Sequence, residues 1–215
     1  MIVETLVGPV PAALASAVSW TANAIAVLCI IPPLIRGWRP PPATWGIWTA
    51  AGIVGSIGIA MAGGGPATWG LKLALSIGPL IVCIVSTRAG VPWRATRTDG
   101  VCLALAGAGL IALLFGQGLT AMWLSIAVNA IGTPPTLVHA MRKPREESYF
   151  PFACAFVSVA AVLALAVPWP WTVAAVAYPI YLLIDVTVIM GTIRYARARD
   201  RRRAALRSVR VVRPA

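Results

Sequence analysis

The sequence is poor in charged residues, and this scarcity excludes most classes of soluble protein. Asp, Glu, Lys and Arg make up 11% of the 215 residues, hydrophobic residues make up 59%, and the mean hydropathy is +0.84. A typical soluble domain is about 25% charged. Apolar runs of about 20 residues, long enough to cross a hydrocarbon core of about 30 Å, recur along the chain. The composition therefore predicts a polytopic membrane protein.

The residue types that build common catalytic and metal sites are also scarce. The chain has six acidic residues, one histidine and four cysteines. It has no HExxH motif, no paired carboxylates inside an apolar run, and no plausible Ser/His/Asp set. The cysteines, which lie in apolar runs without CxxC spacing, are typical of small buried side chains rather than disulfides or metal ligands. We therefore expect no enzymatic activity, no metal and no cofactor. Glu4 and the lack of early basic residues also predict no cleavable signal peptide.

Hydrophobic periodicity and glycine or proline breaks predict an all-α membrane protein with seven transmembrane helices. The expected spans are 12–35, 44–62, 69–87, 100–116, 120–141, 150–167 and 171–193.

The distribution of basic residues predicts the orientation of these helices. Seventeen of the 18 Lys and Arg follow the first, third, fifth or seventh span, and Lys72 is the exception. Under the positive-inside rule, the N-terminus is then outside and the C-terminus is in the cytoplasm. Lys72, near the outer start of its span, is expected to extend to the outer surface. Trp38, Trp45 and Trp48, near the inner ends, are interpreted as interfacial anchors.

Pairs of proline residues recur at similar offsets, which indicates an internal duplication. Pro32 and Pro33 precede Pro134 and Pro135 by 102 residues, and Pro79 precedes Pro179 by 100. Proline removes a helical hydrogen bond, so these residues are candidate hinges. Repeats of this kind are typical of transporters, with the binding site at the repeat interface.

The predicted plan is a 3+1+3 arrangement of two parallel three-helix repeats. Residues 12–87 form the first repeat, 88–119 a loop and linker helix, 120–193 the second repeat, and 194–215 a basic tail. The linker helix is needed because a three-helix unit would otherwise be inverted in its second copy.

The loop after the second proline pair resembles that of PQ-loop repeat proteins and SWEET-type transporters. The residues that carry the resemblance are Pro134, Pro135, Arg142, Lys143, Glu147, Ser148, Pro151 and Phe152. Pro33 and Pro135 replace the glutamine of the PQ motif. The resemblance implies a carrier for a small polar solute, such as a sugar, an amino acid or a vitamin-like molecule, with alternating access between the repeats. The alternative is a non-transporting membrane protein that uses this fold to bind a partner.

Asp185 is the strongest candidate for a functional residue. It lies nine residues before Arg194 in the last span, hence about 13 Å deeper along a helix. A carboxylate at that depth is costly and indicates a substrate or proton pathway. The alternative is a structural Asp that is hydrogen-bonded or paired with an arginine at the helix end. Loss of transport without loss of binding, in an Asp185→Asn variant, would distinguish the two.

Other polar residues in the spans are weaker candidates for the same pathway. Asn23 and Asn129 precede the proline pairs, but such residues more often form hydrogen bonds between helices. Tyr178 and Tyr181 flank Pro179, where aromatic residues are also common in packed cores.

The C-terminal tail holds nine arginines between Arg194 and Arg213. It is interpreted first as a topology anchor, and second as a contact for anionic lipids at about 1 kcal/mol per basic residue. The tail has no aromatic interleaving, so nucleic-acid binding is not expected. The expected partners are the bilayer and a small solute, with a homo-oligomer left open. The expected location is a plasma membrane of bacterial type, and the excess of arginine over lysine, with abundant Ala, Gly and Pro, indicates a GC-rich genome.

Overall fold

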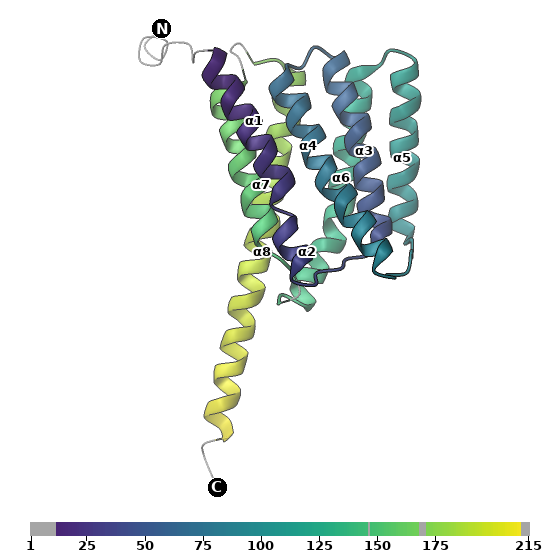
Figure 1. The fold of residues 1–215 in the computed structure, drawn as a ribbon. Coiled ribbons are helices and arrows are strands. Elements are labelled where there is room, and N and C mark those ends of the chain that lie inside the picture. Colours follow the sequence, from purple (N-terminus) through teal and green to yellow (C-terminus); the bar gives the residue numbers. More distant parts are fainter. Residues whose placement is uncertain (1–11, 146, 168–170, 212–215) are drawn as a thin grey trace.

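The computed structural model describes residues 12–145, 147–167 and 171–211, and these residues form helices without strands. The helices are α1 (Ala12–Leu28), α2 (Ile31–Ile35), α3 (Pro42–Met61), α4 (Pro66–Arg88), α5 (Arg97–Leu114), α6 (Gly118–Arg142), α7 (Phe150–Ala161), the π-helical turn η1 (Val162–Ala166) and α8 (Val173–Val211). They run up and down through one bundle, from which the C-terminal half of α8 projects (Figure 1).

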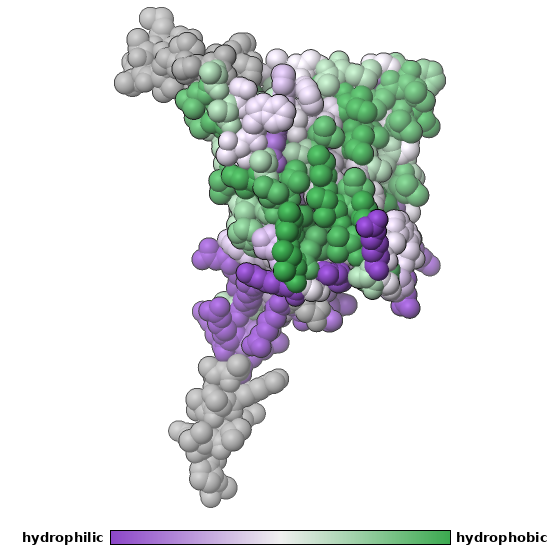
Figure 2. Space-filling model, in the orientation of Figure 1, coloured by the Kyte–Doolittle hydropathy of each residue, from purple (hydrophilic) through white to green (hydrophobic). Residues whose placement is uncertain are grey.

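The prediction of an integral membrane protein built from apolar helices is confirmed at that level. Six helical segments are long and apolar enough to cross a membrane, and Phe150–Leu165 is a shorter apolar helix. Large hydrophobic side chains such as Leu114, Phe115 and Ile184 are exposed on the bundle. In the visible face, apolar residues cover the bundle and hydrophilic residues gather at one end and along the α8 projection (Figure 2). Exposed apolar side chains in such a belt fit contact with lipid.

Glycine and proline set the helix boundaries, as the sequence predicted. Pro42 and Pro66 start α3 and α4, where the missing N–H of proline costs nothing. Gly63, Gly90 and Gly116 follow α3, α4 and α5 with φ of 81°, 77° and 71°. This left-handed conformation is accessible to glycine without steric penalty, and it ends a helix by satisfying its last carbonyls.

The helices pack in a defined order. In the first half of the chain, α4 contacts both α1 and α3; in the second half, α8 contacts both α6 and α7. The halves meet where α3 packs on α6 and α1 packs on α7 and η1, while α5 lies against α3 and α6. Figure 1 shows α5 at the edge of the bundle, beside α3 and α6.

Small residues along α3 allow the closest helix contacts. A Cβ atom on Gly52 would overlap the Ser76 side chain of α4, and one on Gly58 would lie 2.8 Å from the carbonyl oxygen of Gly118 in α6. The Ser125 hydroxyl of α6 also donates to the Ala51 carbonyl at 2.7 Å. Close backbone approach and interhelical hydrogen bonds are the usual means by which helices associate in lipid.

The proline pairs differ in their effect on the helices. The predicted span 12–35 is interrupted at Cys29 and Ile30, and Pro32 and Pro33 begin the short helix α2. By contrast, α6 continues through Pro134 and Pro135 to Arg142.

Pro179 lies inside α8, and its missing N–H leaves the carbonyl of Ala175 without an intrahelical donor. The Thr68 hydroxyl of α4 donates to that carbonyl at 2.9 Å. A partner on a neighbouring helix is the condition under which proline is tolerated inside a membrane helix. Pro179 is therefore accommodated by a contact between the two halves of the chain.

The last helix is longer than predicted. The expected span ended at residue 193, but α8 continues to Val211, well into the basic tail. The segment from Arg194 to Arg210 is rich in Ala and Arg, which favour helix, and it contains no proline. Residues 212–215 lie outside the described residues, as do Pro168–Pro170 of a predicted outer loop.

Candidate functional site

A cavity of about 120 Å³ lies in the bundle, lined by residues of α1, α3, α4, α6, α7 and α8. Helices from both halves of the chain therefore surround it. Cavities of about 150 Å³ in protein cores accommodate benzene, so this one fits a solute of similar size or a few water molecules. Most of its wall is apolar, and its polar side chains include Asp185, Asn129, Thr133, Ser76 and Lys72.

Asp185 lies in this wall and is hydrogen-bonded to a neighbouring helix. The Thr133 hydroxyl of α6 lies 2.8 Å from Asp185 Oδ1 and 2.9 Å from the Asn129 carbonyl oxygen. A hydroxyl has one proton to donate. With Asp185 ionised, Thr133 can donate to the carboxylate; with Asp185 protonated, the carboxyl can donate to Thr133, which then donates to Asn129. The arrangement supports both protonation states of Asp185.

The two tyrosines have different surroundings. Tyr178 is buried and lines the cavity, two turns before Asp185 in α8. Tyr181 does not line the cavity, and its buried hydroxyl has no hydrogen-bond partner among the described residues. A buried polar group without a hydrogen bond is costly, so the Tyr181 hydroxyl is a destabilising feature of this part of α8.

Lys72 does not reach the outer surface, contrary to the sequence-based expectation. Its side chain is 2% exposed and lines the cavity. The Nζ atom lies 4.0 Å from the centroid of the Tyr178 ring, in a cation–π contact.

The path of the lysine side chain explains its burial. The Lys72 Cε atom lies 2.9 Å from the position that a Cβ on Gly55 of α3 would occupy, so glycine at this position leaves space for the lysine side chain. The sequence does indicate which face of the helix Lys72 shares. Lys72, Ser76 and Pro79 have the i, i+4, i+7 spacing of one helical face.

Three tryptophans close the wall of the cavity toward the basic end of the bundle. The rings of Trp38 and Trp45 meet edge to face at 5.2 Å, and those of Trp45 and Trp48 are 5.3 Å apart. The Trp48 indole N–H is buried against Gly132 and has no hydrogen-bond partner among the described residues. The three residues also line the cavity, and their role as interfacial anchors stays a prediction.

The remaining candidates lie in or around the cavity wall to different degrees. Asn129 and Pro79 line it, but Asn23 does not. The Asn23 amide nitrogen lies against α4, 3.3 Å from the position of a Cβ on Gly70. Its Oδ1 is buried and accepts no hydrogen bond from the described part of the chain. The roles of these residues in a pathway or as hinges stay predictions.

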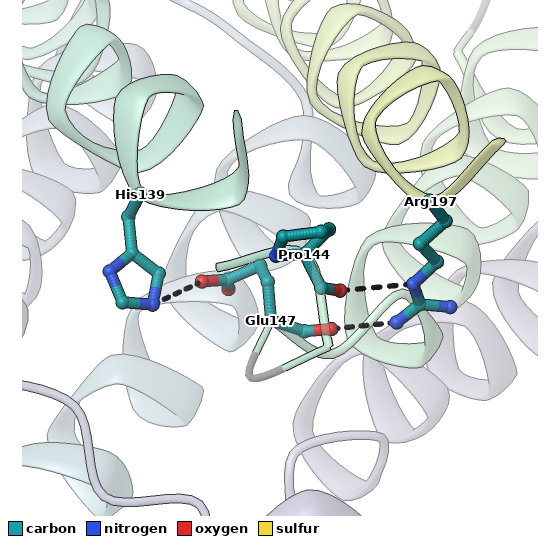
Figure 3. A network of polar contacts seen from close by, with 4 residues as sticks. All are labelled: His139, Pro144, Glu147 and Arg197. Carbon is teal, nitrogen blue, oxygen red and sulfur yellow. Dashed lines mark hydrogen bonds and ion pairs between the residues drawn. The ribbon is translucent and has the colours of Figure 1, made fainter. Parts of the chain in front are cut away.

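The loop between α6 and α7 is held by the projecting part of α8 (Figure 3). Arg197 Nε donates to the Pro144 carbonyl at 3.0 Å, and its Nη2 donates to the Glu147 carbonyl at 2.8 Å. His139 Nε2 lies 3.7 Å from the Glu147 carboxylate, whose side chain is buried. Glu147, noted in the sequence for its loop motif, thus lies between His139 of α6 and Arg197 of α8, and Arg197 holds the loop through two backbone carbonyls.

This loop should be less stable at alkaline pH. Burial raises the pKa of Glu147 from an ordinary value of 4.5 to about 7, although Arg197 opposes this effect. Between these values the folded loop holds a proton that the unfolded loop lacks, so its stability is fully present below about pH 4.5 and is lost as the pH rises through about 7. We expect hydrogen-exchange protection of the loop, corrected for the intrinsic rate, to fall by up to about tenfold per pH unit between about pH 4.5 and 7 and to level off above 7.

A Glu147→Gln variant should remove this pH dependence, whereas Asp200→Asn, which changes a more exposed carboxylate on α8, should keep it. A loop protected equally at pH 6 and pH 9 in the wild type would contradict the assignment.

The described residues contain no group of three or more His, Cys, Asp or Glu placed to hold a metal ion, and the four cysteines are free thiols. Comparison of the chain with protein-family models, with curated proteins and with solved structures gave no match.

Proposed function

We propose that this chain is a membrane carrier for a small polar solute, with alternating access between two three-helix repeats. The observation that carries the proposal is the cavity between the halves of the chain, with Asp185 in its wall. Ionisable side chains inside membrane spans are rare and generally mark substrate, ion or proton pathways.

The packing order supports the 3+1+3 plan, with α1–α2, α3 and α4 as one repeat, α5 as linker, and α6, α7–η1 and α8 as the other. In each proposed repeat the third helix packs between the first and the second. Between repeats, the first helix of each packs on the second helix of the other, as in the pairs α1·α7 and α6·α3. A pseudo-twofold axis along the membrane normal, as in parallel transporter repeats, would produce this reciprocal pattern.

We place the hydrophilic end of the bundle in the cytoplasm. The loops after α2, α4 and α6 and the projecting part of α8 lie at that end (Figure 1). These segments are basic, and the positive-inside rule assigns them to the inner face. The start of α1 is then outside and the end of α8 inside. In this orientation the arginines of α8 can contact anionic lipids.

Asp185 is proposed to couple solute movement to protons. Thr133 can stabilise either protonation state of the carboxyl group. Pro179, six residues earlier in α8, replaces a helical hydrogen bond with a contact to Thr68, so a change of angle there would move Asp185 relative to α4.

A non-transporting binding protein on the same fold is the alternative, and the largely apolar wall of the cavity favours it. The two functions are separated by experiment. A thermal-shift screen of the purified protein against sugars, amino acids and vitamins would identify a solute, and uptake would then be measured in proteoliposomes. We expect uptake that depends on a pH gradient. Binding without uptake under any gradient would support the binding protein instead.

A further inference from the structure

We propose that the solute carries a carboxylate or a similarly compact anionic group, and that Lys72 is the residue that binds it. This inference names the solute class of the proposed carrier and therefore rests on the proposed function. It assigns a role to a residue that the loop motif and the proline hinges leave unexplained.

The inference rests on the burial of the Lys72 side chain without a counter-ion in the described part of the chain. Its side chain is almost completely buried, yet no Asp or Glu of the described residues lies within ion-pair distance of Nζ. An ammonium group buried without a counter-ion loses its hydration and gains little in return. The cation–π contact with the face of Tyr178 offsets only part of this loss. A bound anion in the adjoining cavity would supply the missing partner.

Asp185 is too far along α8 to be that partner. It lies seven residues after Tyr178, or about 10 Å along the helix axis, and its carboxylate contacts Thr133 instead. The two ionisable groups thus lie at different levels of one cavity wall. The charge of Lys72 is available to the solute, and Asp185 with Thr133 offers hydrogen bonds to another part of it.

The cavity also restricts the size and chemistry of the solute. Its volume of about 120 Å³ fits a molecule near the size of benzene rather than a disaccharide. Its apolar and aromatic wall favours solutes with few polar groups beyond those at Lys72 and Asp185. A purely cationic solute would be repelled by Lys72. Small hydroxy acids and amino acids satisfy these conditions better than sugars do.

Pairs of acids and amides of nearly equal shape test the inference on the wild-type protein. Lactate and lactamide, and alanine and alaninamide, would be compared by calorimetry and thermal shift at constant ionic strength. We expect at least one acid to bind at least about tenfold more tightly than its amide, because the amide leaves Lys72 unpaired. Equal binding of each acid and its amide, or binding of neither, would overturn the inference without use of any variant.

Substitutions at the two lysines then locate the anion. Lys72→Met keeps the length of the side chain and removes its charge, and it should lower acid affinity about tenfold or more while Lys72→Arg restores part of it. Lys143→Met, at an exposed loop position, is the matched control and should leave the affinity for the acid unchanged. Unchanged acid affinity in folded Lys72→Met protein would contradict the inference. If acids bind through Lys72 but are not taken up in proteoliposomes, the anion site is supported and the carrier function is contradicted.

Discussion

Replacement of Asp185 by asparagine is expected to lower pH-gradient-driven uptake about tenfold or more while leaving solute binding nearly unchanged. Asparagine has almost the same shape as aspartate but cannot take up or release a proton. Its amide oxygen can still accept the hydrogen bond from Thr133, so the contact between α6 and α8 is kept.

The experiment compares wild type, Asp185→Asn and Asp200→Asn in proteoliposomes with and without a pH gradient. Asp200 lies on the projecting part of α8 and does not line the cavity, so its substitution should leave uptake unchanged. Equal gradient-driven uptake by wild type and Asp185→Asn would make Asp185 a structural residue. Wild-type uptake that ignores the gradient would remove the proton from the mechanism.

A Gly58→Leu substitution is expected to have the largest effect on stability. The backbone nitrogen of Met122 and the carbonyl oxygen of Gly118 lie 2.9 and 2.8 Å from the position of its Cβ. Backbone atoms cannot rotate away, so α3 and α6 must separate. Overpacking of this kind costs about 1–3 kcal/mol, and the α3–α6 contact joins the two proposed repeats.

Gly107→Leu on α5 is the matched control, because a Cβ at Gly107 meets no atom of the described residues within 4 Å. It should be neutral or stabilising, since leucine favours helix more than glycine does. Thermal unfolding in detergent measures both variants. A Gly58→Leu protein as stable as the Gly107→Leu protein would show that the α3–α6 contact is looser than described.

Helix positions could be predicted from the sequence because apolar length and Gly/Pro punctuation are local signals. The ends of α3, α4 and α5 lie within about three residues of the predicted ones, at Gly63, Gly90 and Gly116. The length of α8 was missed because the arginine-rich segment was interpreted by its charge, whereas its composition also favours helix.

The candidate site was predicted only in part, because the direction of the Lys72 side chain depends on a neighbouring helix. Asp185 was recognised because depth in a span can be counted from the nearest arginine. Lys72 lies near the start of its span, where long basic side chains usually extend to the membrane surface. Its burial depends on the space that Gly55 leaves on a different helix, and such a tertiary contact is not visible in the sequence around Lys72.

Access to the cavity from both sides of the membrane is the most direct test of a carrier. Cys29 lines the cavity and provides a native reporter once Cys83, Cys102 and Cys154 are replaced by alanine. In vesicles of known orientation, a membrane-impermeant maleimide would be added to one side at a time. The account predicts that Cys29 is labelled from either side, and that a bound solute slows both reactions. Labelling from one side only, with and without solute and under either pH gradient, would contradict alternating access.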